Sequence, residues 1–385
     1  MADILCAHGD RFLDRYRSSF SFQQLKAFRA IQRCRTAALG GHRDACLRCG
    51  YQAISYNSCR NRHCPKCQTQ ARQRWLAARE CELLNTGYFH VVFTVPHELN
   101  VLALENPRLF YDLLFTASAQ TLLEIAADPK HLGAEIGLIS ILHTWGQNLL
   151  LHPHIHCVVP AGGLAPDHRH WVRPRYPFFL PVKVLSRVFR GKFLAGLKRL
   201  HRHKKLQCAG PAAALADRQQ FTKLIRRYTA TTGWSMPSPL SAAPCRCWRY
   251  LGRYTHRVAI SNHRLLAFEQ ERVTFRWKDY AHGGKQGTMT LGATEFLRRF
   301  FLHVLPRGFV RIRHFGFLAN RFRASRLALG RQLLGSSPTL EEVHPQQVQS
   351  ESSSLWHCPR CGASMVLIQR FTAAELTACM FFDSS

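Results

Sequence analysis

The stretch His154-Ile155-His156-Cys157-Val158-Val159-Pro160 is an apolar run interrupted by two histidines. In a β-strand, residues two apart point to the same face of the sheet, so both imidazoles would share one face while Ile155 turns into the core. Unpaired imidazoles in an apolar strand are costly unless they are hydrogen-bonded or bound to a metal. The stretch therefore predicts a buried strand that carries either a metal site or two satisfied core histidines.

A hard cation such as Mg²⁺ or Mn²⁺ would be held incompletely by two histidines, so we expect a third protein ligand. Gln147 is the first candidate, and His143 and His256 follow. His152 has the same strand parity as the pair, but Pro153 is expected to disturb the strand there, so His152 is left outside the site.

Around this strand the sequence mixes helices and strands without regular alternation, which favours an α+β fold with a largely antiparallel sheet. Other strands are predicted over 88–95, 136–143, 258–260, 273–277 and 309–314. Helices are predicted over 22–36, 69–84, 109–127, 184–202, 216–231 and 294–304. The Pro/Ser-rich segment 236–239 is predicted to be a turn that precedes a further helix.

Composition limits the possible partners. The 385 residues contain 53 Lys+Arg against 23 Asp+Glu, a formal net charge of +30, which favours nucleic acid over a membrane surface. The length allows three parts, which we expect over 1–85, 86–334 and 335–385, the last being a flexible linker with a Cys-x-x-Cys tail. The first residues do not resemble a signal peptide, and no apolar run is long enough to span a membrane, so we expect a bacterial cytoplasmic, nucleoid-associated protein.

The cysteines predict zinc binding in a reducing compartment. Cys46-x-x-Cys49 and Cys64-x-x-Cys67 together offer four thiolates for one tetrahedral zinc ion. Three further residues lie close enough to replace a ligand or build a second site, or to serve ordinary packing: His42, Cys59 and His63. The later pair Cys358-x-x-Cys361 is half a site, and Cys245 and Cys247, His357, or no residue at all are its possible partners. Basic residues around the knuckles are expected to contact DNA: Arg60, Arg62 and Lys66.

Tyr250 and Tyr254 are four residues apart, so on a helix both phenols would line one pocket. A cationic stripe is expected beside them: Arg249, Arg253 and Arg257. Positive charge of this kind helps a phenol to act as a nucleophile near neutral pH. The two tyrosines are equally compatible with core aromatics at helical spacing.

Four segments together resemble the rolling-circle transposases of the insertion sequence 91 family. They are CRNRHCPKCQ at 59–68, HTWGQN at 143–148 followed by His154-Ile155-His156, YLGRYTHRVAIS at 250–261, and FRWKDY at 275–280. The resemblance extends over roughly residues 15 to 330. It implies an N-terminal zinc-binding, DNA-binding domain over 1–85 and a catalytic domain of the His-hydrophobic-His nuclease superfamily over 86–334, with an RRM-like antiparallel sheet flanked by helices.

The resemblance implies an enzyme that nicks and rejoins single-stranded DNA, both at element ends and in target DNA. Tyr250 or Tyr254 would form a 5′-phosphotyrosine, Mg²⁺ or Mn²⁺ would be the catalytic ion, Zn²⁺ would be structural, and a homo-oligomer is possible. Two alternatives stay open: a non-catalytic zinc-ribbon DNA-binding regulator, and a tyrosine recombinase that acts on duplex DNA without metal. A carboxylate-triad transposase is disfavoured because acidic residues are sparse.

Overall fold

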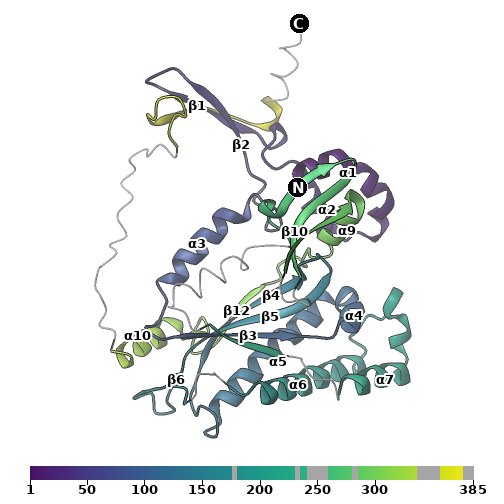
Figure 1. The fold of residues 1–385 in the computed structure, drawn as a ribbon, viewed down its shortest axis with the longest axis vertical. Coiled ribbons are helices and arrows are strands. Elements are labelled where there is room, and N and C mark those ends of the chain that lie inside the picture. The colour runs from purple at the N-terminus through teal and green to yellow at the C-terminus, as the bar shows by residue number, and fades with distance from the viewer. Residues whose placement is uncertain (176–179, 230–234, 241–258, 280–284, 336–355, 376–385) are drawn as a thin grey trace.

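A five-stranded antiparallel sheet with the order β12-β4-β5-β3-β8 lies at the centre of the computed structural model (Figure 1). The structure describes residues 1–175, 180–229, 235–240, 259–279, 285–335 and 356–375. The strands of this sheet are β3 (Tyr88–Thr94), β4 (Gly137–Trp145), β5 (Leu151–Pro160), β8 (Ser235–Leu240) and β12 (Ile312–Gly316).

The two faces of the central sheet are covered differently. Ile155, Cys157 and Val159 of β5 are completely buried against a helical layer, as the alternating pattern of this strand predicted. That layer consists of α4 (Asn100–Glu105), α5 (Pro107–Ala127), α6 (Val182–Arg202) and α7 (Arg218–Thr229). On the opposite face, Val158 and Ile139 pack in a smaller cluster that includes Leu327 of α10 (Arg323–Leu333).

The N-terminal helices pack against a second, three-stranded antiparallel sheet with the order β11-β10-β9. Phe12 and Phe28 contact Phe301, with ring centroids 5.9 and 5.7 Å apart, and we call this the aromatic cluster. Its elements are α1 (Ala2–Tyr16), α2 (Phe22–Gln32), β9 (Leu265–Glu269), β10 (Arg272–Asp279), β11 (Lys285–Gly292) and α9 (Ala293–Phe301). The division after residue 85 stays a prediction, and a shared hydrophobic core crosses it.

A third sheet has the order β13-β1-β2 and lies apart from the central sheet in Figure 1. Its strands are β1 (Gly41–Cys46), β2 (Gln52–Tyr56) and β13 (Met365–Phe371). Helix α3 (Gln68–Glu80) follows β2 in sequence. Part of the segment expected to be a flexible linker and tail is therefore an ordered strand that pairs with β1. The remaining linker, 336–355, lies outside the described residues.

The other elements are short. A two-stranded sheet consists of β6 (Gly163–Leu164) and β7 (Trp171–Val172). Short 3-10 helices lie at Arg17–Ser19, Ala37–Leu39, His97–Leu99, Gly210–Ala216 and Asn262–Arg264. Among the residues described, none of the helices combines the length and the apolar character needed to cross a lipid bilayer.

Of three local predictions, two were wrong and one was confirmed. The segment 236–239 is not a turn but part of β8, where prolines are tolerated because β8 is an edge strand with few ladder hydrogen bonds to donate. The disturbance expected at Pro153 is confirmed, because the register of β5 with β4 shifts opposite this proline, between His143 and Trp145, although the strand continues to Leu151. The predicted strand over 258–260 is absent from its described part, since Ala259 has a left-handed φ of 54°.

Candidate functional site

Three histidines converge on the face of the central sheet opposite the helical layer. His143 of β4 and His154 of β5 are direct cross-strand partners, and His156 follows two residues later on the same face. Their side-chain nitrogens lie within 4.8 Å of one another, and we call this set the histidine cluster. Strand periodicity and antiparallel register are sufficient to bring them together.

Hydrogen bonds fix two of these rings. The Nδ1 of His154 lies 2.6 Å from the backbone oxygen of His152 and must donate to it, because a carbonyl only accepts. The Nδ1 of His156 lies 2.7 Å from the Nε2 of His90 on β3, and these two rings stack in parallel. Bonds of this kind to the second ring nitrogen orient histidines that ligate metals, leaving Nε2 to face the ion.

Burial keeps the imidazole rings of His154, His156 and His90 neutral. It lowers the pKa of His154 to about 3 and that of His156 well below its usual value, and neighbouring histidines add to both shifts. Burial likewise lowers the pKa of His90 to about 4. Neutral imidazole is the form that binds metals, so the donor set fits a divalent cation.

The third ligand of this set differs in rank from the expectation. His143, the second candidate, provides the third ring of the histidine cluster. The recorded contact of Gln147, the first candidate, is its backbone oxygen, which accepts a hydrogen bond from Arg264 at 2.6 Å. Ligation by the Gln147 side chain stays a prediction, and His256 lies outside the described residues. His90 was missed, although a histidine inside the apolar strand 88–95 was a usable signal.

The loop that joins the two histidine-bearing strands is held by the neighbouring lobe, which comprises the N-terminal helices, the second sheet and α9. We call residues 146–150 the connecting loop. Three of its backbone oxygens accept hydrogen bonds: that of Gln147 from Arg264 at 2.6 Å, that of Asn148 from Arg299 at 3.0 Å, and that of Leu149 from His303 at 3.0 Å. These donors fix the hairpin from outside its own strands.

Tyr250 and Tyr254, and the arginines at 249, 253 and 257, lie outside the described residues. The described chain before them ends at β8, which pairs with β3, the strand that carries His90. The described chain resumes at Ala259 and Ile260, which are buried in the hydrophobic core that contains the aromatic cluster.

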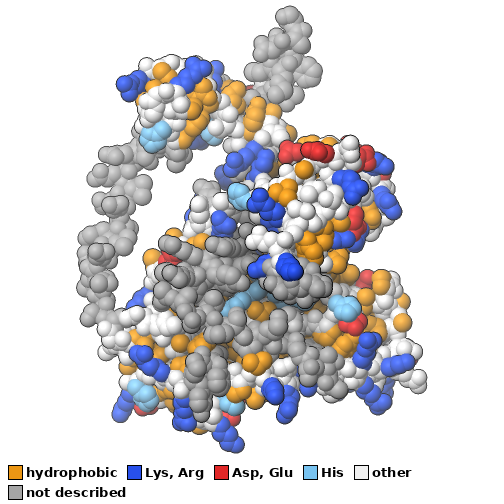
Figure 2. Space-filling model, viewed as in Figure 1, with side chains coloured by type: hydrophobic (Ala, Val, Ile, Leu, Met, Phe, Trp, Pro, Cys, Tyr) orange, Lys and Arg blue, Asp and Glu red, His pale blue; other side chains and the backbone are white. Residues whose placement is uncertain are grey.

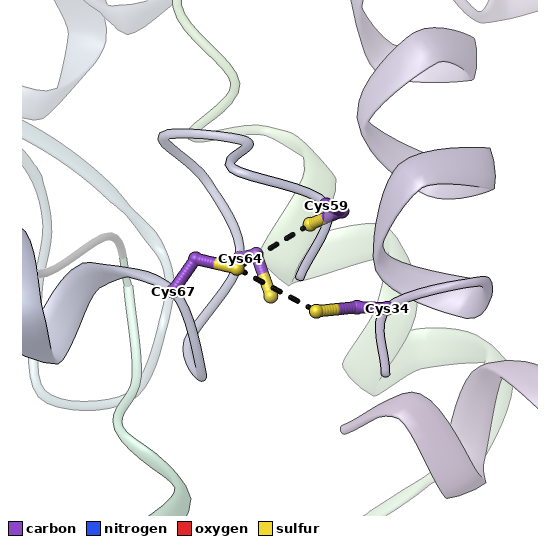
Figure 3. Close-up of side chains that lie close together, drawn as sticks. All are labelled: Cys34, Cys59, Cys64 and Cys67. Carbon is purple, nitrogen blue, oxygen red and sulfur yellow. Dashed lines mark hydrogen bonds between the residues drawn. The ribbon is translucent and has the colours of Figure 1, made fainter. Parts of the chain in front are cut away.

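Four thiols gather between α2 and α3 (Figure 3). They are Cys34, Cys59, Cys64 and Cys67, which we call the first cysteine cluster. The Sγ of Cys67 lies 3.5 Å from that of Cys34 and 3.6 Å from that of Cys59. Tetrahedral zinc, with Zn–S bonds of about 2.3 Å, places its sulfurs about 3.8 Å apart. The spacing and the donor type both fit zinc.

Hydrogen bonds between the thiols of the first cysteine cluster shift their pKa values in opposite directions. The hydrogen bond from Cys59 lowers the pKa of Cys64 to about 5, and the same bond raises the pKa of Cys59. Burial raises the pKa of Cys34 to about 11. One thiolate is therefore stabilised by its neighbours, and a bound zinc ion would deprotonate the whole set.

The predicted grouping of Cys46 and Cys49 with Cys64 and Cys67 is corrected by the structure. Cys64 and Cys67 lie with Cys34 and Cys59, and the pair at 46 and 49 lies with the tail pair at 358 and 361. The reason is topological: the first pair is the turn between β1 and β2, and β13 carries the tail pair to it. Cys59 had been an alternative ligand, whereas Cys34 was missed because a lone cysteine carries no spacing signal.

Arg62 connects the segment before α3 to the segment before β12. Its guanidinium donates to the backbone oxygens of Phe309 at 2.7 Å and Pro306 at 3.4 Å. Beside it, the Nε2 of His63 accepts from the backbone N–H of Leu305 at 3.2 Å. Arg62, predicted to contact DNA, thus also has a structural role, and both Arg60 and Arg62 are exposed.

Basic side chains extend beyond these predicted contacts. Figure 2 shows Lys and Arg over the lobe that holds β1 and β2 and along the opposite rim of the molecule. With a net charge of +30, this distribution agrees with a polyanionic partner.

Comparison with known proteins gives a consistent result. A family model described as "Transposase zinc-binding domain" matches residues 4–95, and one described as "Putative transposase" matches residues 137–326. The "Putative transposase y4qJ" of Sinorhizobium fredii (strain NBRC 101917 / NGR234) is 49% identical over 379 residues, 96% of this chain and 95% of that protein. The "Transposase for insertion sequence element IS801" of Pseudomonas savastanoi pv. phaseolicola is 28% identical over 357 residues, 89% of this chain and 81% of that protein. No solved structure matches the chain. The first cysteine cluster lies wholly within the zinc-binding match and supports a structural zinc ion.

Proposed function

Because this chain belongs to the insertion sequence 91 family of transposases, we propose that it nicks and rejoins single-stranded DNA through a 5′-phosphotyrosine during rolling-circle transposition. The observation that carries this proposal is the histidine cluster, in which three imidazoles from two adjacent strands face one point. When bound there, a divalent ion such as Mg²⁺ or Mn²⁺ would supply positive charge to the scissile phosphate.

The protein's own groups have separate tasks. His90 and the backbone oxygen of His152 hold the rings of His156 and His154 in fixed orientations. The connecting loop keeps β4 and β5 in register, so the three rings stay converged without substrate. Such preorganisation avoids reorganisation at the moment of reaction. Gln147 is retained as a further ligand in this proposal.

The covalent step exchanges one phosphate ester for another. The oxygen of Tyr250 or Tyr254 loses its proton and attacks phosphorus, a Tyr O–P bond forms, and the P–O3′ bond breaks. The departing 3′-oxygen takes up a proton and becomes a free 3′-hydroxyl. Attack of a 3′-hydroxyl on the phosphotyrosine reverses the step and rejoins DNA, so no external energy source is needed. Arg249, Arg253 and Arg257 would favour the ionised phenol.

Covalent trapping tests this proposal. The full chain is incubated with labelled single-stranded DNA from element ends and Mn²⁺, and a denaturation-resistant protein–DNA band is measured. We expect Tyr250→Phe with Tyr254→Phe to abolish the band and His154→Ala to reduce it at least about 100-fold, since catalysis by a bound metal is worth several kcal/mol. Tyr56→Phe, which alters a phenol on β2, is the matched control and should leave the band unchanged.

Other outcomes separate the alternatives. Stable DNA binding without any adduct under all divalent ions would point to a zinc-ribbon regulator. An adduct that forms on duplex DNA in the presence of chelator would point to a metal-independent recombinase. Single substitution of each tyrosine reports which phenol attacks first.

A further inference from the structure

We propose that Cys46, Cys49, Cys358 and Cys361 bind a second zinc ion, and that this ion joins residues 356–375 to the N-terminal region as one zinc-ribbon lobe. These residues form the second cysteine cluster, with all four sulfurs within 4.8 Å of one another. The Sγ atoms of Cys46 and Cys361 lie 3.4 Å apart, and those of Cys49 and Cys358 lie 3.6 Å apart. These separations resemble those of the first cysteine cluster and suit tetrahedral zinc.

The two halves of the second cluster are built alike. Each has the sequence Cys-x-Arg-Cys-Gly, at 46–50 and at 358–362. In each half the glycine N–H donates to the first cysteine's oxygen at 2.9 Å, and the glycine has a φ of +71°. In each half the first cysteine's N–H donates to the residue after the glycine, Tyr51 at 2.8 Å and Ala363 at 2.7 Å. Two matching turns with four inward sulfurs form a metal-binding knuckle pair, which chance packing would not repeat.

Strand pairing supports the same conclusion. β13 pairs with β1 in antiparallel register from Gly41 opposite Phe371 to Cys46 opposite Met365. Each knuckle is therefore joined to one strand of a shared sheet. The ladder brings the knuckles together although they are far apart in sequence.

The apolar core under this sheet is too small to stabilise it alone. Its buried members are Cys46, Cys358 and Met365, with Tyr51, Ala53, Trp356, Cys361 and Ala363 packed partly against them. Lobes of this size usually require a metal or disulfides. Two further contacts join the segments: Trp356 Nε1 donates to Asp44 Oδ2 at 3.3 Å, and Arg360 lies over the Tyr51 ring.

The tail knuckle lies outside both matched family segments, which cover 4–95 and 137–326. The matched zinc-binding segment contains only half of the second site. The remaining half must come from residues 358 and 361, so the N-terminal region of this chain is incomplete without them.

Zinc stoichiometry tests the inference. Native mass spectrometry of the full chain should show two zinc ions. Cys358→Ser with Cys361→Ser should leave one, and Cys46→Ser with Cys49→Ser should also leave one. All four substitutions together should still leave one, because both pairs belong to the same site. The matched control is Cys6→Ser with Cys81→Ser, which changes two exposed cysteines outside both clusters and should leave two ions.

A second measurement needs no substitution. Thiols of the wild-type chain are alkylated with time and each cysteine is quantified by mass spectrometry. Cys358 and Cys361 should react as slowly as Cys46 and Cys49, at least about ten times more slowly than Cys81, until a strong chelator is added. A single zinc ion in the wild-type chain, alkylation of the tail pair at the rate of Cys81, or a disulfide within the cluster would each overturn the inference.

Discussion

His90 belongs to no His-x-His pair, so its only signal in the sequence is its place inside an apolar strand. It lies on the strand next to β5, and its Nε2 is 2.7 Å from the Nδ1 of His156. A residue that orients a ligand without being one carries no spacing signal in the sequence. The histidines at 154 and 156 were identifiable because strand periodicity alone places them on one face.

We predict that His90→Ala weakens Mn²⁺ binding by roughly 10- to 100-fold, the usual effect of removing a group that orients a metal-ligating histidine. The reason is that the ring of His156 loses its partner at 2.7 Å. Isothermal titration calorimetry with Mn²⁺ measures the affinity. His90→Gln should recover part of it, and exposed His97→Ala is the control. Equal affinities for His90→Ala and the wild type would remove His90 from this role.

At the scale of elements, the connecting loop shows how one lobe positions the site on another. Arg299 follows Arg298 on α9, and both pair with Glu295. Only Arg299 also reaches the loop, at the backbone oxygen of Asn148. Substituting each arginine in turn therefore distinguishes the loop contact, which Arg299 makes, from the ion pair with Glu295, which both arginines make.

We expect Arg299→Ala to slow adduct formation about tenfold, whereas Arg298→Ala changes it less than twofold. Loss of one hydrogen bond from a charged donor costs about 1.5–3 kcal/mol, and part of that loss should appear as misalignment of β4 and β5. Single-turnover rates of strand cleavage measure it. Similar rates for both variants would show that the loop contact does not position the site.

Several long elements could be predicted from the sequence, because α6 has a periodic apolar pattern and α5, β3, β4 and β5 are rich in apolar residues. The failures have physical causes. β8 contains two prolines and is a strand only because β3 offers it an edge. β13 depends on β1, which lies at the other end of the sequence, and Cys34 joins its cluster through tertiary packing. Local patterns do not encode such long-range partners.

At the scale of the whole molecule, His303 joins the lobe of the second sheet to the central sheet. It is buried, its Nε2 donates to the backbone oxygen of Leu149, and its Nδ1 therefore accepts from the hydroxyl of Thr144 at 3.1 Å. Burial lowers the pKa of His303 to about 4. The unfolded chain, with an ordinary histidine pKa of about 6.5, binds this proton at a higher pH than the folded chain.

The stability of the folded chain should therefore decrease as the pH falls. The stabilising contribution is present above about pH 6.5 and is lost as the pH falls toward 4. Between pH 7.5 and 5, His303 alone should reduce the free energy of unfolding by about 2 kcal/mol. Denaturant unfolding at both pH values measures this change. His303→Gln should make the pH dependence shallower by that amount, whereas the solvent-exposed His97→Gln should not. An unchanged slope in His303→Gln would contradict the assignment.

The pairing of β1 with β13 also has a consequence during protein synthesis. β1 leaves the ribosome long before β13 is translated, so its outer edge has no partner while most of the polypeptide is still being made. A nonsense or frameshift mutation anywhere between them would leave that edge permanently open. Such a shortened product would differ from the intact protein in the region synthesised first, even though the mutation lies far downstream.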